Sequence, residues 1–250
     1  MTQDSRATGP RLSQTRNRIA AMARFMNRTL LAAGLAAALA PAPAFARSDF
    51  QQWATASVSI KASDSVRVQN ELVARFSDDR NGLYEIENSL LVGFKLNDKV
   101  TAWAGYVHNP NYNAGDFTVM ERRAREQLTF DNIAKLGKAS LSARLRLEQR
   151  WRDHVDGTGW RVRPYLKLGV PLGGKSAPTL NLTSETFLNL NSVGFQSQDG
   201  LDRMRTAASL SVPLSKTLKL EGGYLNQHRF VRNGPDNDDH ALTGTISLSF

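Results

Sequence analysis

The stretch KASLSARLRLEQRW, residues Lys138–Trp151, alternates between apolar and polar side chains and decides the fold class. One set of alternate positions holds Leu141, Ala143, Leu145 and Leu147. The other set holds Ser140, Ser142, Arg144, Arg146, Glu148 and Arg150. Successive side chains of a β-strand point to opposite faces, so this period of two indicates a strand with one apolar face and one charged face.

The same alternation recurs along the rest of the chain. It is clear over 65–76, 83–96, 160–170, 201–214 and 242–250, and weaker over 52–61, 99–109, 118–131, 179–190 and 217–230. Turn-forming residues separate several of these segments, at Asn97-Asp98, Asp156-Gly157, Pro171-Leu172-Gly173-Gly174 and Asn233-Gly234-Pro235. We therefore expect one all-β domain over 47–250 with about eleven long strands. Such strands exceed the roughly 5–6 residues usual in soluble sheets and suit tilted membrane strands.

The first 46 residues have a different composition. Residues 30–40, LLAAGLAAALA, form an apolar run that is too short for a membrane-spanning helix, which needs roughly 20 residues. Two arginines precede the run, and the small residues Ala44 and Ala46 follow it. This order is typical of a secretory signal peptide, with cleavage expected before Arg47. A mitochondrial transit peptide is the alternative, because the segment is rich in arginine and poor in acids.

The overall charge of +9 lies mostly in this N-terminal segment, which holds six arginines and one aspartate. The remaining 204 residues carry 26 basic and 22 acidic side chains, so the composition argues against a nucleic-acid partner. The chain has no cysteine, which excludes a disulfide scaffold, a thiolate metal site and a lipidated cysteine anchor. No motif predicts a cofactor.

A closed sheet with alternating faces can be a soluble barrel, with its apolar side chains inside, or a membrane barrel, with them outside. An arginine that faces lipid at the membrane centre costs roughly 2–4 kcal/mol. Arg144 and Arg146 turned outward would cost about 4–8 kcal/mol, comparable to the stability of a domain. In a membrane both must therefore line the lumen. Arg122 and Glu126 fall on the apolar face of 118–131 and fit only if that end lies above the lipid or a bulge shifts the register.

Three features favour a membrane barrel over a soluble periplasmic ligand-binding barrel. Aromatic residues lie near strand ends on the apolar faces, at Phe76, Tyr84, Phe94, Tyr106, Phe130, Trp151, Tyr224 and Phe250. Connections alternate in length, with long ones expected at 109–117, 191–200 and 231–239. The alternating last strand ends in Phe250 and resembles the signal by which the β-barrel assembly machinery recognises bacterial outer-membrane barrels.

These features predict a single closed antiparallel transmembrane β-barrel of roughly 10–12 strands, in contact with outer-membrane lipid after removal of the signal peptide. If both termini face the periplasm, the number of strands is even. The count of eleven therefore predicts that one weak segment is not a full strand or that a further strand has been missed.

Several motifs are shared with a known family. They are Trp53, ERRAREQ at 121–127, RLRLEQR at 144–150, Trp160-Arg161-Val162-Arg163-Pro164-Tyr165, Glu185 and Arg203-Met204-Arg205. With them, the mature chain resembles an uncharacterised family of bacterial outer-membrane β-barrels, domain of unknown function 2490. The resemblance implies a fold and a location, and it supplies neither an activity nor catalytic residues.

The charged strand faces hold the main group of candidate site residues in the sequence. The expected lumen ladder consists of Arg67, Glu71, Arg75, Glu85, Glu87, Glu121, Arg123, Arg125, Arg144, Arg146, Glu148, Arg150, Arg161, Arg163, Glu185, Arg203 and Arg205. One hypothesis is a structural ladder in which ion pairs fill a narrow barrel. The other is an arginine-biased conduit or pocket that attracts small anionic solutes or lipid headgroups.

An enzyme is a further alternative, since outer-membrane lipid hydrolases use serine and histidine. His108, His154 and His240 are expected at or near long outer loops, and His228 near the outer end of its strand. A hydrolase needs a nucleophile and a base within hydrogen-bond reach, and the chain has no G-x-S-x-G motif. We therefore expect no catalytic residues.

Two further motifs have ordinary explanations. Gly173–Ser176 is similar to the end of a phosphate-binding loop but lacks its upstream glycine and a following helix, so we expect a turn. Asp236, Asp238 and Asp239 are expected in an outer loop, where they could bind a divalent cation only weakly. We therefore expect no metal site.

Overall fold

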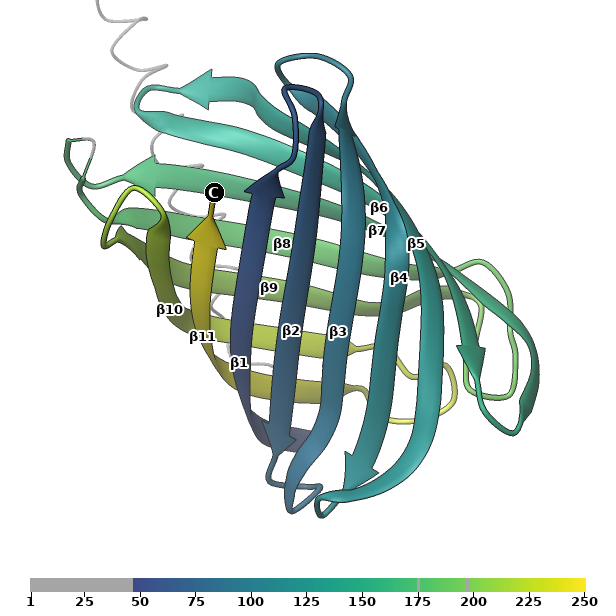
Figure 1. Ribbon diagram of the computed structural model, residues 1–250. Coiled ribbons are helices and arrows are strands. Elements are labelled where there is room, and N and C mark those ends of the chain that lie inside the picture. Colours follow the sequence, from purple (N-terminus) through teal and green to yellow (C-terminus); the bar gives the residue numbers. More distant parts are fainter. Residues whose placement is uncertain (1–46, 175, 197) are drawn as a thin grey trace, which may run out of the picture. The chain divides into compact units, whose positions relative to one another are not determined.

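The computed structural model describes residues 47–174, 176–196 and 198–250, which form a closed barrel of eleven strands (Figure 1). The strands are β1 (Arg47–Lys61), β2 (Val66–Ser77), β3 (Gly82–Lys95), β4 (Val100–Asn113), β5 (Asp116–Leu136), β6 (Ala139–Arg152), β7 (Val155–Pro171), β8 (Thr179–Asn189), β9 (Gly200–Pro213), β10 (Leu218–Arg229) and β11 (Asn237–Ser249). Within these described ranges, no helix has the length and hydrophobicity needed to cross a membrane. The predicted cleavage site at Ala44 and Ala46 lies outside the described residues.

Each strand pairs with its neighbour in sequence in antiparallel fashion, and β1 closes the barrel against β11. This closing pair is parallel and runs from Arg47 opposite Asn237 to Ser59 opposite Ser249. The expectation of an even number of strands is therefore wrong. Each of the eleven predicted segments is a strand, and a parallel closure accommodates the odd number. Because the two closing strands run in the same direction, Arg47 and Phe250 lie at opposite ends of the barrel.

The last residue of the chain takes part in the closure. The backbone N–H of Phe250 donates to the carbonyl of Ser59 at 2.9 Å, and the N–H of Lys61 donates to the carbonyl of Phe250 at 2.8 Å. The ring of Phe250 is exposed. The terminal phenylalanine therefore contributes its backbone to the sheet and its side chain to the outer surface.

The two ends of the barrel carry different connections. At the Phe250 end these are 62–65, 96–99, 137–138, 172–178 and 214–217, and at the Arg47 end they are 78–81, 114–115, 153–154, 190–199 and 230–236. The long loop predicted over 109–117 is wrong, because β4 and β5 meet at a two-residue turn in which Ala114 has a φ of 52°. The turn predicted at Asp156-Gly157 lies inside β7.

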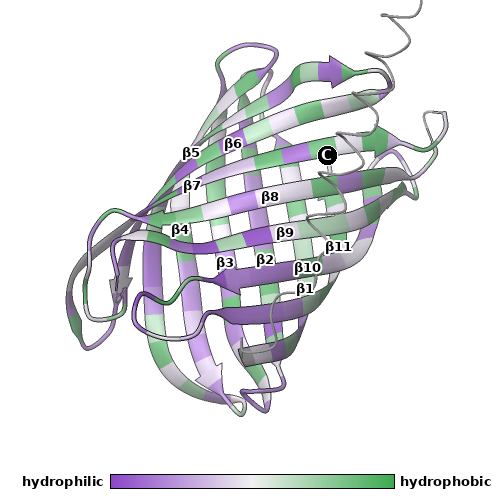
Figure 2. Cartoon of the chain, turned by 180° about the vertical axis from the view of Figure 1, so that it is seen from behind, coloured by the Kyte–Doolittle hydropathy of each residue, from purple (hydrophilic) through white to green (hydrophobic). Residues whose placement is uncertain are grey.

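The barrel wall is apolar outside and charged inside, and the alternation along each strand is visible in Figure 2. Leu90, Leu145 and Leu166 are each about half exposed on the outer face. The buried set is dominated by polar and charged side chains, among them Arg125, Glu148 and Arg161. This is the reverse of a soluble barrel, which buries its apolar face.

Most of the aromatic residues expected on the outer surface are there, including Phe94, Tyr106 and Tyr224. Tyr84 is an exception. The register between β2 and β3 shifts at Arg75, so that Tyr84 has no direct cross-strand partner and its ring turns inward. Its hydroxyl donates to Gln51 Oε1 at 2.8 Å. A bulge of this kind re-aims a side chain and explains why period-two alternation fails at this position.

Arg122 and Glu126 face outward, as the alternation indicates, and the register of β5 is continuous around them. The bulge offered as one explanation is therefore absent at both positions. Each finds a polar neighbour on the same outer face. Arg122 pairs with Asp153, and Glu126 accepts a hydrogen bond from Gln149 Nε2 at 3.3 Å.

Candidate functional site

The inner wall carries a continuous network of ion pairs. It joins five glutamates to eight arginines from β2, β3, β5, β6, β7 and β8, and its members are Arg75, Glu85, Glu87, Glu121, Arg123, Arg125, Arg144, Glu148, Arg150, Arg152, Arg161, Arg163 and Glu185. Alternation places these side chains on the inner face, and cross-strand register brings opposite charges within reach.

Glu148 is the centre of this network. Its carboxylate lies 2.8 Å from Arg125 Nη2, 2.6 Å from Arg161 Nη2 and 2.9 Å from Arg163 Nη1. The side chain of Glu148 is 0% exposed. A single carboxylate of β6 thus balances three guanidinium groups, one from β5 and two from β7, in a place without solvent.

Glu87 connects the two sides of the network. Its carboxylate lies 2.8 Å from Arg125 Nη2, 3.0 Å from Arg123 Nη1 and 3.4 Å from Arg75 Nη2. Arg75 also pairs with Glu85. Since Arg125 contacts both Glu87 and Glu148, it bridges β3 and β6, which are not neighbours in the sheet.

Two further glutamates complete the network. Glu121 lies 2.7 Å from Arg123 Nε, 3.0 Å from Arg150 Nε and 2.7 Å from Arg152 Nη2. Glu185 pairs with Arg144, and lies 2.9 Å from Arg163 Nη2. The network therefore contains no glutamate without a partner, as burial of a charge requires.

Two aromatic side chains inside the barrel were not predicted as site residues. Phe187 is 1% exposed, and four guanidinium groups surround its ring, from Arg163 at 4.3 Å to Arg203 at 5.4 Å. Trp53 lies under Arg75 and Arg205, at 4.5 and 4.6 Å from the ring centroid. These distances permit cation–π attraction. The alternation does place Phe187 on the same face as Glu185, but aromatic packing on cations leaves no signal of its own in the sequence.

The paired charges and these rings form a buried layer inside the barrel. Arg125, Glu148, Phe187 and Val107 come from four strands and are each exposed by 1% or less. Arg205 of β9 lies over the ring of Trp53 of β1, and this contact joins two strands that are not neighbours in the sheet. We refer to this layer, defined by Trp53, Arg125, Glu148, Phe187 and Arg205, as the plug.

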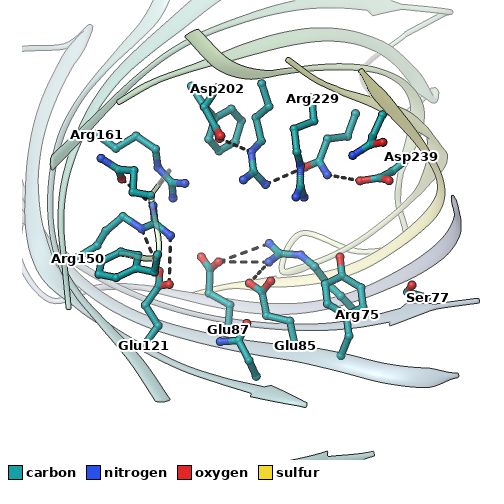
Figure 3. A pocket seen from close by; sticks show the side chains of 18 of the residues that line it. Arg75, Ser77, Glu85, Glu87, Glu121, Arg150, Arg161, Asp202, Arg229 and Asp239 are labelled. Atoms are coloured by element: carbon teal, nitrogen blue, oxygen red, sulfur yellow. Dashed lines mark hydrogen bonds and ion pairs between the residues drawn. The ribbon is translucent and has the colours of Figure 1, made fainter. Parts of the chain in front are cut away.

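Beyond the plug, towards the Arg47 end, lies a cavity of about 530 Å³, to which all eleven strands contribute (Figure 3). We refer to it as the vestibule. Among the described residues that line it are ten arginines and seven carboxylates, so its wall carries an excess of positive charge. Figure 3 shows Glu85, Glu87 and Glu121 on one wall, facing Asp202 and Arg229 on the other.

The loop 190–199 folds towards this vestibule. Gln196 is buried, donates to the carbonyl of Trp160 at 3.1 Å and accepts from Arg150 Nη1 at 2.9 Å. The ring of Phe195 lies 5.2 Å from the Arg150 guanidinium. The loop thus contributes one aromatic side chain, Phe195, and two amide side chains, Gln196 and Gln198, to the lining of the vestibule.

Some members of the predicted ladder are not part of the network. Arg67 and Glu71 lie closer to the Phe250 end of β2, and neither has an ion-pair partner among the described residues. Arg146 is buried but donates to an amide, Gln127 Oε1 at 2.9 Å. Arg203 pairs with its chain neighbour Asp202 at 2.7 Å, and Arg205 donates to Gln227 Oε1 at 2.8 Å. The ion-pair network therefore includes only part of the predicted ladder, and the arginines outside it have more varied partners.

Two of the three histidines predicted at or near long loops lie elsewhere, whereas His240 lies close to the connection 230–236. His108 is exposed within β4, His154 occupies the tight turn 153–154 with a φ of 64°, and His240 lies within β11. His228 lies at the Arg47 end of β10, with Nδ1 2.9 Å from Asp238. No hydrogen bond among the described residues joins a histidine to a serine.

The three aspartates predicted in one loop do not converge. Asp236 and Asp238 flank His228, whereas Asp239 faces inward and accepts from Gln227 Nε2. Asp238 and Asp239 belong to β11 and point to opposite faces. Gly173, Gly174 and Ser176 lie in the connection between β7 and β8, as expected for a turn.

Comparison with known proteins places these features in a family. A curated relative, an uncharacterized protein of Methylorubrum extorquens strain AM1, is 28% identical over 177 residues, which cover 68% of this chain and 76% of that protein. A solved structure, the siderophore receptor PirA from Pseudomonas aeruginosa, is 16% identical with a TM-score of 0.27 and 73% of this chain covered. The matched region spans 34% of the receptor, about a third of its length. A family match covers residues 50–238, most of the barrel, and the chain therefore belongs to the family described as Protein of unknown function (DUF2490).

Proposed function

We propose that this chain is an integral outer-membrane β-barrel whose lumen is closed by the plug and whose vestibule opens at the cell surface. The observation that carries the proposal is the distribution of side chains. Leucines and aromatic rings cover the outside, while Arg125, Glu148 and their partners occupy the inside. In water this arrangement would expose a large apolar belt and bury many charges, whereas in a lipid bilayer both faces find a suitable environment.

Strand length supports a membrane location. A strand of 14 residues, such as β3 or β6, rises about 3.3 Å per residue and at a tilt of about 45° spans roughly 33 Å. The apolar belt of outer-membrane barrels is about 25 Å tall. The strands thus cross the apolar layer and leave a margin at each end.

The connections support an orientation. Short turns are typical of the periplasmic side and longer loops of the outer side, and the loop 190–199 lies at the Arg47 end. We infer that Phe250 lies at the periplasmic face, where the C-terminal strand meets the assembly machinery. The parallel closure then puts the start of β1 at the outer face.

Closure of the lumen distinguishes two functions. The burial of Arg125, Glu148 and Phe187 supports a closed barrel, in which ion pairs replace an apolar core. The excess of arginine in the vestibule wall supports the second candidate, a narrow pore for small anionic solutes. We favour the closed barrel, because Arg125, Glu148 and Phe187 are buried and each glutamate of the network is held by at least one guanidinium.

Two measurements test the proposal. Cell fractionation should place the protein in the outer membrane, and recovery of a soluble periplasmic pool would reject the membrane location. Refolded protein in planar bilayers should give no steady single-channel current. Steady current from the unmodified protein would instead establish the pore. The variant Arg125→Ala with Glu148→Ala removes the centre of the plug as a neutral pair and serves as the positive control for conductance.

We also infer that the chain is not a lipid hydrolase, since its four histidines are scattered over three strands and a turn. A lipid-hydrolysis assay tests this. Turnover by the unmodified protein that is lost when any one of the four histidines is changed to alanine would contradict the inference.

A further inference from the structure

The vestibule wall formed by β9 and β10 carries arginines that the protein itself does not neutralise. Arg205 and Arg229 both line the vestibule, and among the described residues neither has a carboxylate oxygen within 4 Å. The Nε atom of Arg229 is buried without a hydrogen-bond partner. A buried N–H that lacks an acceptor is costly, and a guanidinium without a carboxylate partner can still bind an anion from outside the chain.

The register between β9 and β10 concentrates positive charge in this part of the wall. Arg203 and Arg229 are directly opposite one another in the β9–β10 ladder, and like charges in that position repel. The next pair inward is Arg205 opposite Gln227. Asp202 is the one carboxylate paired with this group of three guanidinium groups, and it lies 2.7 Å from Arg203 Nε.

The side-chain amide of Gln227, which lies beside these arginines, already has hydrogen-bond partners. Gln227 Oε1 accepts from Arg205 Nε at 2.8 Å, and Gln227 Nε2 donates to Asp239. Arg205 is also held by two rings, those of Trp53 and Phe187 at 4.6 and 4.7 Å. The Nε side of Arg205 is therefore fixed, while its two terminal amino groups have no hydrogen-bond partner among the described residues. They are held in place before any ligand arrives.

We propose that Arg203, Arg205 and Arg229 form a binding site for a small oxyanion, a phosphate or carboxylate group, that enters the vestibule from the Arg47 end. This site rests on the proposed function, which makes that end the outer one. Guanidinium groups present paired donors that match the oxygens of phosphate and carboxylate. The volume of about 530 Å³ also leaves room for the remainder of a small molecule that bears the anion.

Titration calorimetry with inorganic phosphate, on the refolded mature barrel in a detergent with neutral headgroups, tests this site. We expect saturable binding at one site. Arg205→Gln and Arg229→Gln should each weaken it about ten-fold or more, as expected for loss of a charged hydrogen bond. Arg205→Lys keeps the charge but loses the paired donors, so it should restore only part of the affinity.

Two matched controls lose the same charge elsewhere. The first control is Arg152→Gln. Arg152 lies in the vestibule wall and pairs with Glu121, which in this variant still has Arg123 and Arg150 as partners. The second control is Lys99→Gln, in a turn at the Phe250 end. Both should bind phosphate within about two-fold of the unmodified protein. An equal loss in Arg152→Gln and Arg205→Gln would show diffuse attraction and overturn the site.

The same calorimetry, carried out in lipid vesicles, distinguishes a soluble oxyanion from a lipid headgroup. Binding that is equal in phosphatidylcholine vesicles and in vesicles with added phosphatidylglycerol supports a solute from the aqueous phase. Phosphate binding that is lost only in the vesicles with phosphatidylglycerol supports a lipid headgroup that occupies the same arginines. A barrel that is folded and membrane-embedded but gives no heat with phosphate overturns this inference alone, whereas a soluble protein overturns the proposed function.

Discussion

Arg125 and Glu148 form an ion pair that is sealed from solvent. Their Nη2 and Oε1 atoms are 2.8 Å apart, and the side chains are 1% and 0% exposed. Pairs of this kind contribute little net stability, but removal of one partner leaves an uncompensated buried charge. The pair therefore explains why the interior of this barrel can be charged, and it identifies where the barrel is most sensitive to substitution.

Glu148→Gln should destabilise the barrel by about 3–5 kcal/mol, because it leaves three buried guanidiniums without their shared carboxylate. The free energy of unfolding in lipid vesicles, from urea titration, measures this. Glu71→Gln is the matched control, since Glu71 of β2 has no ion-pair partner among the described residues, and it should change the free energy by about 0.5 kcal/mol or less. Equal effects of the two substitutions would contradict the role given to Glu148.

Leu145→Arg should destabilise the barrel in vesicles by about 2–4 kcal/mol, since Leu145 faces outward at the middle of β6. Leu172→Arg makes the same chemical change in the 172–178 turn, outside the apolar belt, and should cost about 0–1 kcal/mol. If both variants unfold at the same urea concentration as the unmodified barrel, Leu145 does not contact lipid.

An epitope tag placed directly before Arg47 should be accessible to antibody on intact cells, because the parallel closure puts the start of β1 at the loop end. A tag within the loop 190–199 should behave in the same way, and a tag within 214–217 should require permeabilised cells. Surface labelling of the 214–217 tag alone would reverse the proposed orientation.

Deletion of Phe250 should impair closure, since it removes the two backbone hydrogen bonds with Ser59 and Lys61. At about 0.5–1.5 kcal/mol each, the loss should be about 1–3 kcal/mol on unfolding in vesicles. Phe250→Ala keeps both bonds and should refold normally in vitro while assembling poorly in cells. Normal assembly of Phe250→Ala in cells would mean that the ring is not a recognition signal.

The contact between the two longest connections at the Arg47 end should weaken at low pH. Arg232 Nη2 donates to Asp199 Oδ1 at 2.6 Å, and this hydrogen bond lowers the pKa of the Asp199 carboxyl below its ordinary value. The stabilising contact is therefore fully present above the ordinary carboxyl pKa and is lost as the pH falls through the lowered pKa. Amide hydrogen exchange over 230–236 should accelerate in that acidic window. Asp199→Asn should remove the pH dependence, and exchange that stays pH-dependent in this variant would assign the effect to another group.

Local sequence was enough to predict which way most side chains point. A period of two forces Arg144 and Arg146 to the face opposite Leu145, and the cost of charge in lipid then fixes which face is inside. All eleven strands follow from the same argument, because alternation is a property of consecutive residues.

Tertiary structure decided what depends on residues far apart in the chain. The pairing of β1 with β11 joins segments about 190 residues apart, and no local period could distinguish a parallel closure from an even number of strands. The bulge at Arg75 turned Tyr84 inward, and only the assembled barrel brought Arg205 between Trp53 and Phe187. Alternation assigns a side chain to a face, whereas its partner on that face is set by strand register and by distances across the lumen, which exist only once the sheet has closed.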